Sequence, residues 1–438
     1  MKRIIFLQLI MTTLCVTQAF GQFEISAELR PRLEVNNGFN FTPTQETDVT
    51  TYISQRSRLN FQLTKEKYAI YVSLQDARIW GDENISSGTG AFSNSSSTGL
   101  YQAWMKLKLF KSSTLKIGRQ EFMYDDQRLL SIRNWPQSGI TYDAILFQYY
   151  KNKWQFDIAL SYNNDNKKGT SAGSGLNNFD VDPISRRLRT LNFVYLKRNI
   201  LDGWYVSATG LLTGYQKDKT TSTIYLMATY GLHSEFKKAG FESRINLYGQ
   251  SGKSQLGKEV SSWMMTAEAA YRIKKWRLGA GIDLLSGHDA SKNDADYQKT
   301  EHNFDLFYGI RYLRYGLMNQ YVLPSGTLNG GLVDIYPSIH FYPNNKNKVS
   351  IDYHHFALQQ SVVDPFAEKA YLEGSLGSEI DLVWSHSFSK ELILNAGFCY
   401  YITNDTYSKV KQVDPQYLET PYFGWLMITF KPTLFRFE

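Results

Sequence analysis

Two arginines stand on one face of a segment that alternates in polarity, residues 52–63. Arg56 and Arg58 lie on its polar face, whereas Leu59 and Leu63 lie on the other. In an extended strand both guanidinium groups therefore project to the same side, two residues apart. A planar guanidinium binds a carboxylate through two parallel hydrogen bonds, which suits acidic sugars as ligands. The same arginines could instead pair with acidic residues of the protein and brace a wall, and the pattern favours neither role.

Further charged residues of both signs gather where predicted strands give way to longer connections. Such mixed clusters form either a salt-bridged rim or a charged constriction, and the pattern favours structural networks over ligand contacts. The candidates are Asp76 and Arg78 after the second alternating segment, and Glu121, Asp126, Arg128 and Arg133 around the next long connection.

Residues that could support catalysis are sparse. A Ser-Gly-His-Asp sequence at 286–289 falls in a predicted loop, and His354 and His355 alternate along a predicted strand, which points them to opposite faces. Neither provides a nucleophile, a base and an orienting group together, and histidines on opposite faces cannot share a metal ion. No phosphate-binding or dinucleotide motif stands between a strand and a helix. We therefore expect no catalytic residue, no metal and no cofactor.

The elements that must position these residues are short alternating strands. From about residue 23 onward, such strands recur roughly every twenty residues, separated by Gly, Asn, Ser and Lys clusters that are typical of turns. A soluble β-sandwich also alternates, but this length without a domain break is large for one sandwich. It corresponds instead to about 16 to 18 strands of an all-β, antiparallel, up-and-down transmembrane barrel.

The connections between these strands differ in length in a way that supports a barrel. Segments 65–67, 151–153 and 389–391 look short, whereas 81–98, 163–183 and 286–303 look long and polar. Short turns on the periplasmic rim and long loops on the extracellular rim are typical of outer-membrane barrels. One or two of the long loops could fold inward as a constriction.

The first 21 residues predict a cleaved signal peptide. Lys2 and Arg3 precede an apolar stretch that is shorter than the roughly 20 residues a membrane-spanning helix needs, and small residues follow it. We expect a barrel domain over residues 22–438, in a Gram-negative outer membrane after cleavage. Cys399 is then the one remaining cysteine, so no intramolecular disulfide can form, and a buried apolar role is expected for it.

Composition agrees with a barrel. The chain has 30 Tyr, 26 Phe and 9 Trp, as interfacial aromatic girdles require, and its mean hydropathy of −0.37 is polar because alternating faces cancel. The net charge of +7 comes from cations spread singly along the strands. That distribution, together with export, argues against a nucleic-acid partner. In a pore, a cationic excess would attract anions.

An ordered series of short segments runs along the chain. In the N-terminal half it comprises Gln55-Arg56-Ser57-Arg58-Leu59, Leu74-Gln75-Asp76-Ala77-Arg78-Ile79-Trp80-Gly81, Leu115-Lys116-Ile117-Gly118-Arg119-Gln120-Glu121-Phe122, Asp126-Gln127-Arg128-Leu129, Arg133-Asn134-Trp135 and Thr141-Tyr142-Asp143-Ala144. In the C-terminal half it comprises Tyr308-Gly309, Tyr315-Gly316-Leu317-Met318, Asp352-Tyr353-His354-His355-Phe356 and Leu376-Gly377-Ser378-Glu379-Ile380-Asp381.

This series resembles the alginate export family of outer-membrane porins, over essentially the whole mature length. The resemblance implies a monomeric barrel of about 18 strands whose lumenal arginines and lysines guide a polyuronate, and it adds Arg119 to the candidates. Asn319 departs from the family pattern, which has Asp after Met318, so the choice of substrate stays open.

Together these features predict a passive pore for anionic solutes, with acidic oligo- or polysaccharides preferred. The alternatives are a plugged structural or adhesive barrel and an outer-membrane barrel hydrolase. The expected partners are outer-membrane lipid, an anionic saccharide or small anions, and periplasmic export or uptake proteins.

Overall fold

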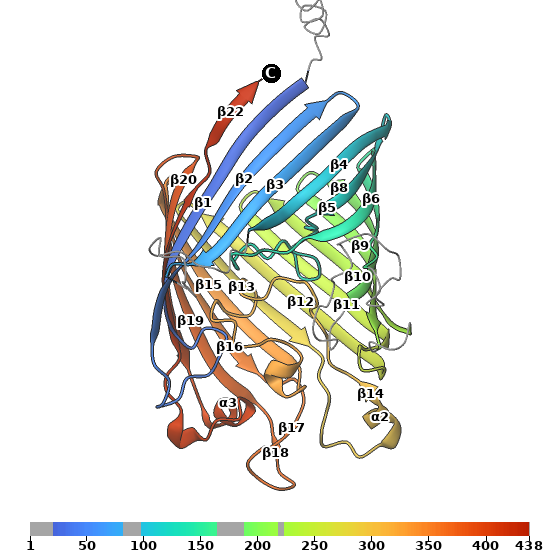
Figure 1. Cartoon of the computed structure of the whole chain (residues 1–438). Coiled ribbons are helices and arrows are strands. Elements are labelled where there is room, and N and C mark those ends of the chain that lie inside the picture. Colours follow the sequence, from blue (N-terminus) through green and yellow to red (C-terminus); the bar gives the residue numbers. More distant parts are fainter. Residues whose placement is uncertain (1–20, 82–97, 164–187, 218–222, 438) are drawn as a thin grey trace, which may run out of the picture.

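The computed structural model describes residues 21–81, 98–163, 188–217 and 223–437, and these form a closed antiparallel β-barrel (Figure 1). The barrel has eighteen strands, counting β21 (Tyr422–Phe430) and β22 (Thr433–Phe437) as one interrupted strand and leaving out the short β14 (Thr300–Glu301). The predicted fold class is confirmed, at the upper end of the expected strand number. The expected signal peptide and most of the long loops 81–98 and 163–183 lie outside the described residues.

Each strand pairs with its neighbour along the chain, and β1 closes the barrel against β21 and β22. The barrel strands are β1 (Gly21–Asn37), β2 (Thr50–Lys65), β3 (Tyr68–Ile79), β4 (Gly99–Phe110), β5 (Ser113–Gln120), β6 (Tyr142–Lys151), β7 (Trp154–Leu160), β8 (Leu188–Leu201), β9 (Trp204–Gln216), β10 (Ile224–Lys238), β11 (Phe241–Lys253), β12 (Glu259–Ile273), β13 (Trp276–Leu285), β15 (Leu332–Asn344), β16 (Asn347–Ala357), β19 (Ser375–Ser387), β20 (Leu392–Ile402), β21 (Tyr422–Phe430) and β22 (Thr433–Phe437).

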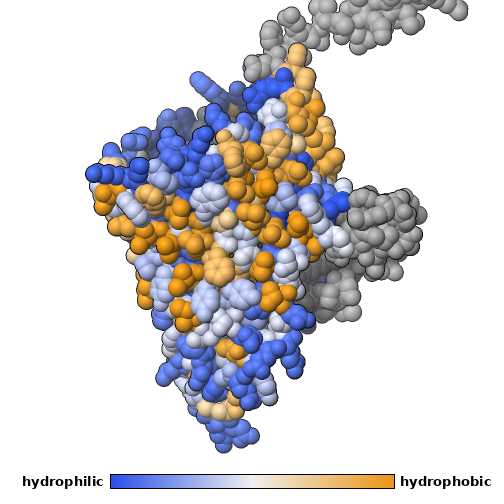
Figure 2. All heavy atoms as spheres, turned by 90° about the vertical axis from the view of Figure 1, so that its left-hand side faces the viewer, coloured by the Kyte–Doolittle hydropathy of each residue, from blue (hydrophilic) through white to orange (hydrophobic). Residues whose placement is uncertain are grey.

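Alternation along the strands gives the barrel an apolar outside and a charged inside. In β1, Leu29 and Leu33 are 43% and 39% exposed, whereas Arg30 and Arg32 are only 3% and 4% exposed. On the face drawn in Figure 2, apolar side chains gather across the middle of the barrel, with hydrophilic residues at its lower end and along the upper left edge. This is the reverse of a soluble protein and matches a surface that faces lipid. No helix among the described residues is long and apolar enough to span a membrane.

The two ends of the barrel differ. One end carries short turns such as 66–67 and 345–346, together with the start of β1 and the end of β22 (Figure 1). The opposite end carries α2 (Ala295–Lys299), β14 (Thr300–Glu301), the hairpin of β17 (Val362–Val363) and β18 (Tyr371–Leu372), and α3 (Asp405–Val410). Because outer-membrane barrels have short periplasmic turns, we assign the short-turn end to the periplasm.

Two connections fold into the lumen. We name residues 121–141, between β5 and β6, the first inner loop, and residues 302–331, before β15, the second inner loop. They touch each other through a parallel β-bridge between Leu130 and Tyr308. An inward-folding loop was expected among the longest connections, but residues 286–301 form α2 and β14 at the extracellular end instead. The two inner loops explain why so many lumenal side chains are buried.

The inner loops pack against the wall through apolar and aromatic side chains. Met318 and Tyr321 of the second inner loop are buried against Phe356 of β16, Tyr401 of β20 and Tyr407 of α3. Tyr321 and Tyr401 also share a hydrogen bond between their hydroxyl groups. One hydrophobic cluster of the protein therefore lies inside the lumen, between the second inner loop and the barrel wall, and a second cluster packs the first inner loop against β6, β8 and β9.

Candidate functional site

A chamber of about 650 Å³ lies between the second inner loop and the barrel wall. Strands β11, β12, β13, β15 and β16 form most of its wall. The second inner loop closes one end with Tyr312, Leu313, Arg314 and Leu317. Lys237, Arg272 and Lys348 line the chamber at the end away from this loop, next to the short periplasmic turns. The chamber therefore lies on the periplasmic side of the second inner loop. Alternation of the wall strands brings their charged side chains into it.

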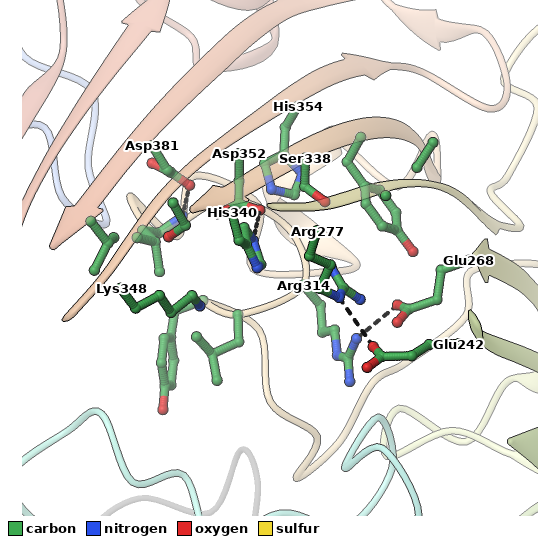
Figure 3. A pocket seen from close by; sticks show the side chains of 18 of the residues that line it. Glu242, Glu268, Arg277, Arg314, Ser338, His340, Lys348, Asp352, His354 and Asp381 are labelled. Atoms are coloured by element: carbon green, nitrogen blue, oxygen red, sulfur yellow. Dashed lines mark hydrogen bonds and ion pairs between the residues drawn. The ribbon is translucent and has the colours of Figure 1, made fainter. Parts of the chain in front are cut away.

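The chamber is lined by charges of both signs. Figure 3 shows Glu242, Glu268, Arg277 and Arg314 grouped on one side, with Lys348 well apart from them. Arg277 Nε donates to Glu242 Oε2 at 3.1 Å, and Arg314 Nη1 donates to Glu268 Oε2 at 3.1 Å. On another wall, His340 Nε2 lies 3.0 Å from Asp352 Oδ1 (Figure 3). Each of these pairs is part-buried.

Two carboxylates hold the second inner loop to the wall. Glu379 and Asp381, two residues apart on β19, accept the backbone N–H groups of Met318 at 2.7 Å and Leu317 at 3.0 Å. Both side chains are buried, and Cys399 of β20 lies opposite Asp381. Glu379, Asp381 and Cys399 offer three ligand atoms within 4.8 Å of one another, so this set could hold a metal ion. In the structure the two carboxylates instead serve as acceptors for the loop.

Arg128 anchors the first inner loop to the wall. Its guanidinium donates to Asp126 of the same loop at 2.9 Å, to Asp283 of β13, and to the hydroxyl of Tyr315 at 3.1 Å. Arg128, Asp126 and Asp283 are nearly inaccessible to solvent. Arg314 lies 3.8 Å from Asp126, so the same network also reaches the second inner loop. The structure therefore brings the predicted candidates Arg128 and Asp126 together, in a buried network that holds the first inner loop to the barrel wall.

Arg56 and Arg58 both project inward, as their alternation predicts, but their partners differ. Arg56 is fully buried, ion-paired with Glu28 of β1, and hydrogen-bonded to Asn134 of the first inner loop at 2.8 Å. Arg58 Nε donates to Gln75 at 2.7 Å, and its guanidinium lies 3.5 Å from the centre of the Tyr101 ring. Arg56 thus braces the wall, whereas no described carboxylate forms an ion pair with Arg58.

Glu121, at the start of the first inner loop, and Arg133, near its middle, line different cavities. Glu121 accepts from the Tyr101 hydroxyl at 2.5 Å and borders a cavity of about 530 Å³ beside β3 to β8. Arg133 donates to the carbonyl of Phe307 and borders a cavity of about 540 Å³ on the extracellular side of the second inner loop. These two candidates therefore remain next to space that a solute can enter.

Three predicted lumenal residues lie on the outward face. Asp76 and Arg78 share the side of β3 that carries Leu74, and they bind each other at 2.6 Å. They were expected in the lumen because they seemed to belong to a loop base, but β3 continues its alternation to Ile79. Arg119 pairs with Asp143 at 2.8 Å on the outward face. The two side chains of this pair are 43% and 55% exposed, so the structure does not bring these residues to the chamber.

Several chamber cations were not among the predicted candidates. Arg244 and Arg277 alternate with apolar residues in β11 and β13, so their inward direction could have been read from the sequence. Arg314 lies in an irregular loop, where no periodicity reveals its direction. The remaining chamber cations are Lys237, Arg272 and Lys348.

The candidate catalytic histidines form hydrogen-bonding contacts with neighbouring side chains. His354 Nδ1 lies 2.9 Å from Asp334 inside the lumen, whereas His355 Nδ1 lies 3.0 Å from the Ser378 hydroxyl. The Ser286 hydroxyl donates to the carbonyl of His302 at 2.7 Å, and His288 Nε2 lies 3.0 Å from Gln298. Ser286 and His288 therefore do not form a nucleophile and base pair in this structure.

Comparison with known proteins agrees with this geometry. A family model described as alginate export matches residues 22–418. No curated protein matches the chain at a significant level.

Solved structures with a similar fold include two outer-membrane proteins of Pseudomonas aeruginosa. OccK3 (OpdO) is 12% identical with a TM-score of 0.60, covering 94% of this chain and 96% of that one. OccK9 (OpdG) is 12% identical with a TM-score of 0.61, covering 94% and 98%. At this identity the likeness extends to the fold alone. The family match covers most of the chain, and the chain therefore belongs to the alginate export family.

Proposed function

We propose that this barrel is an outer-membrane channel that passes anionic solutes, with acidic oligo- or polysaccharides such as uronates as the preferred class. The observation that carries the proposal is the charge of the chamber. Its lining carries more cationic than carboxylate side chains, so an entering anion meets a net positive surface. The cations are Lys237, Arg244, Arg272, Arg277, Arg314 and Lys348, and the carboxylates are Glu242, Glu268, Asp352 and Asp381.

Aromatic side chains in the chamber support a saccharide as the solute. Tyr312, Tyr336, Tyr342, Trp135 and Trp425 line it. Their rings offer flat apolar faces and, in tyrosine and tryptophan, polar edges that can hydrogen-bond to hydroxyl groups. Guanidinium groups beside them match carboxylates. The combination fits a chain of acidic sugars better than a small inorganic anion, which needs charge alone.

The inner loops favour a selective passage over a wide pore. Cavities lie on both sides of the second inner loop, at about 650 Å³ and about 540 Å³. The buried packing of this loop also supports a second candidate function, a plugged barrel whose extracellular loops bind a surface. We regard the channel as acting alone, as a monomer in the outer membrane after removal of residues 1–21, and without catalysis.

Single-channel recording in a planar bilayer tests the proposal. We expect anion-selective steps in a salt gradient and block by uronate oligomers. Arg277→Gln with Arg314→Gln should lower anion selectivity and weaken the block, because both side chains line the chamber. Arg119→Gln is the matched control, since it removes an arginine from the outward face. Well-folded barrels that never conduct would overturn the channel and favour the plugged barrel.

A further inference from the structure

A hollow at the periplasmic rim has charged side chains of one sign only, all of them cationic. It measures about 440 Å³ and lies at the β12–β13 and β15–β16 turns, and we name it the rim hollow. Asparagine, serine, tyrosine and proline residues complete the lining, and no carboxylate takes part. Its cations are Arg272, Lys274, Lys275, Lys346 and Lys348.

These five cations lack the carboxylate partners that four arginines deeper in the lumen have. Arg128, Arg244, Arg277 and Arg314 each bind a carboxylate within the lumen. Within residues 21–81, 98–163, 188–217 and 223–437, no ion pair includes any cation of the rim hollow. Arg272 instead lies 4.3 Å from the centre of the Tyr342 ring. A cluster of like charges whose lining holds no carboxylate is electrostatically unfavourable until an anion arrives.

The rim hollow faces the pore axis. Arg272 is on the inward side of β12, two residues beyond the buried Ala270, while Tyr271 and Ile273 are exposed on the outer side. On β16, Lys348 is on the same side as the buried Ser350. Phospholipid headgroups surround the outer side of the barrel, so this orientation favours a solute over a lipid as the occupant.

The rim hollow and the chamber adjoin each other. Arg272, Tyr342 and Lys348 line both spaces, so an anion held at the rim stands next to Arg277 and the rest of the chamber wall. The extracellular cavity differs, because its cations Arg133, Lys258 and Arg311 face the carboxylates of Glu301 and Asp305. Between these two described cavities, positive charge is therefore less balanced in the rim hollow than in the cavity on the extracellular side of the second inner loop.

We propose that the rim hollow is a capture site that takes an acidic saccharide chain from the periplasm and passes it to the chamber. This inference rests on the proposed function and adds the place of entry and a preferred side. Lysine ammonium groups act as point charges that attract carboxylates without fixing their orientation. A chain can therefore slide past them toward the arginines of the chamber, which bind in a defined geometry.

The test compares block by a uronate oligomer added to one side of the bilayer at a time. The orientation of each channel is fixed by biotin on Ser291→Cys, in the extracellular loop, and by adding streptavidin to one compartment. At low salt, we expect the rate of block from the periplasmic side to exceed that from the extracellular side by about tenfold or more. Raising the salt concentration should shrink this difference, because the charges are exposed.

The triple variant Lys274→Gln, Lys275→Gln, Lys346→Gln should remove most of the difference between the two sides. The control, Lys67→Gln, Lys111→Gln, Lys151→Gln, removes the same charge from other periplasmic turns and should retain it. Equal block from both sides in the wild type, or equal effects of both triple variants, would overturn the capture site while anion block upholds the channel. Absence of anion selectivity and of block from either side would instead overturn the proposed function itself.

Discussion

Arg128 of the first inner loop and Asp283 of β13 form an ion pair in which both side chains are nearly inaccessible to solvent. The two residues are 155 positions apart in the sequence, so the pair fixes a loop from one half of the barrel to the wall of the other half. Asp126 and Tyr315 share the same guanidinium. This buried cation therefore ties the first inner loop to β13 and contacts Tyr315 of the second inner loop, beside the chamber.

Arg128→Ala should destabilise the protein and loosen the first inner loop. The substitution leaves Asp126 and Asp283 buried without their shared cation, which typically costs about 3–5 kcal/mol. We expect a lower unfolding midpoint in detergent and a larger single-channel conductance. Arg119→Ala removes an exposed pair and should cost less than about 1 kcal/mol, with unchanged conductance. Equal stability of the two variants would contradict the bracing role of Arg128.

Arg56 and Arg58 should differ in what their loss does to stability. Arg56→Gln breaks a buried pair with Glu28, so we expect a loss of about 3 kcal/mol or more. Arg58→Gln removes a hydrogen bond to Gln75 and a ring contact with Tyr101, which should cost about 1–2 kcal/mol. Urea unfolding of both variants in detergent measures the difference. A smaller loss for Arg56→Gln than for Arg58→Gln would show that the network around Glu28 contributes little.

The barrel could be predicted from the sequence because polar and apolar residues alternate regularly along its strands. The two-residue alternation gives the inward direction of Arg56, Arg58, Arg244 and Arg277, and the turn lengths distinguish the two rims. The same rule, applied through to the end of β3, would have placed Arg78 outside with Leu74. Its misplacement came from ending the strand too early.

The inner loops could not be predicted, because they have no periodicity. Nothing in the spacing of Arg128 or Arg314 shows that each meets a carboxylate from a strand more than forty residues away. Such contacts depend on tertiary packing inside the lumen. The length of a connection was also a poor guide to whether it folds inward. The long segment 286–303 was expected to be a candidate inward loop, but it forms α2 and β14 at the rim, whereas residues 121–141 fold into the lumen.

Glu379 and Asp381 should control how firmly the second inner loop is held. Replacing both with alanine leaves the N–H groups of Leu317 and Met318 without acceptors. A buried N–H group left without an acceptor costs about 1–3 kcal/mol, so we expect hydrogen exchange at residues 311–323 to accelerate by about tenfold or more. Exchange in the first inner loop at residues 121–130 is the internal reference. Unchanged exchange at residues 311–323 would mean that apolar packing alone holds the loop.

Lys411, just after α3 in an extracellular loop, should make stability depend on pH. Burial against Tyr321 and Tyr407 lowers the pKa of its ammonium group to about 7, whereas an unfolded lysine has a pKa of about 10.4. Between these values the unfolded chain binds a proton that the folded chain does not, so this residue makes stability rise with pH. The rise cannot exceed about 1.4 kcal/mol per pH unit, the limit for one proton.

Lys411→Met removes the titrating group while keeping a long side chain. Unfolding midpoints of wild type and variant, measured in detergent at pH 6, 8 and 10, isolate the contribution of Lys411 from that of all other groups. The wild type should gain stability relative to the variant from pH 7 to pH 10, with little relative change below pH 7. A constant difference across the whole range would show that Lys411 keeps its charge in the folded protein. Its contacts with the Tyr321 ring and with the carbonyls of Gln320 and Gly326 would then hold it as an ammonium ion.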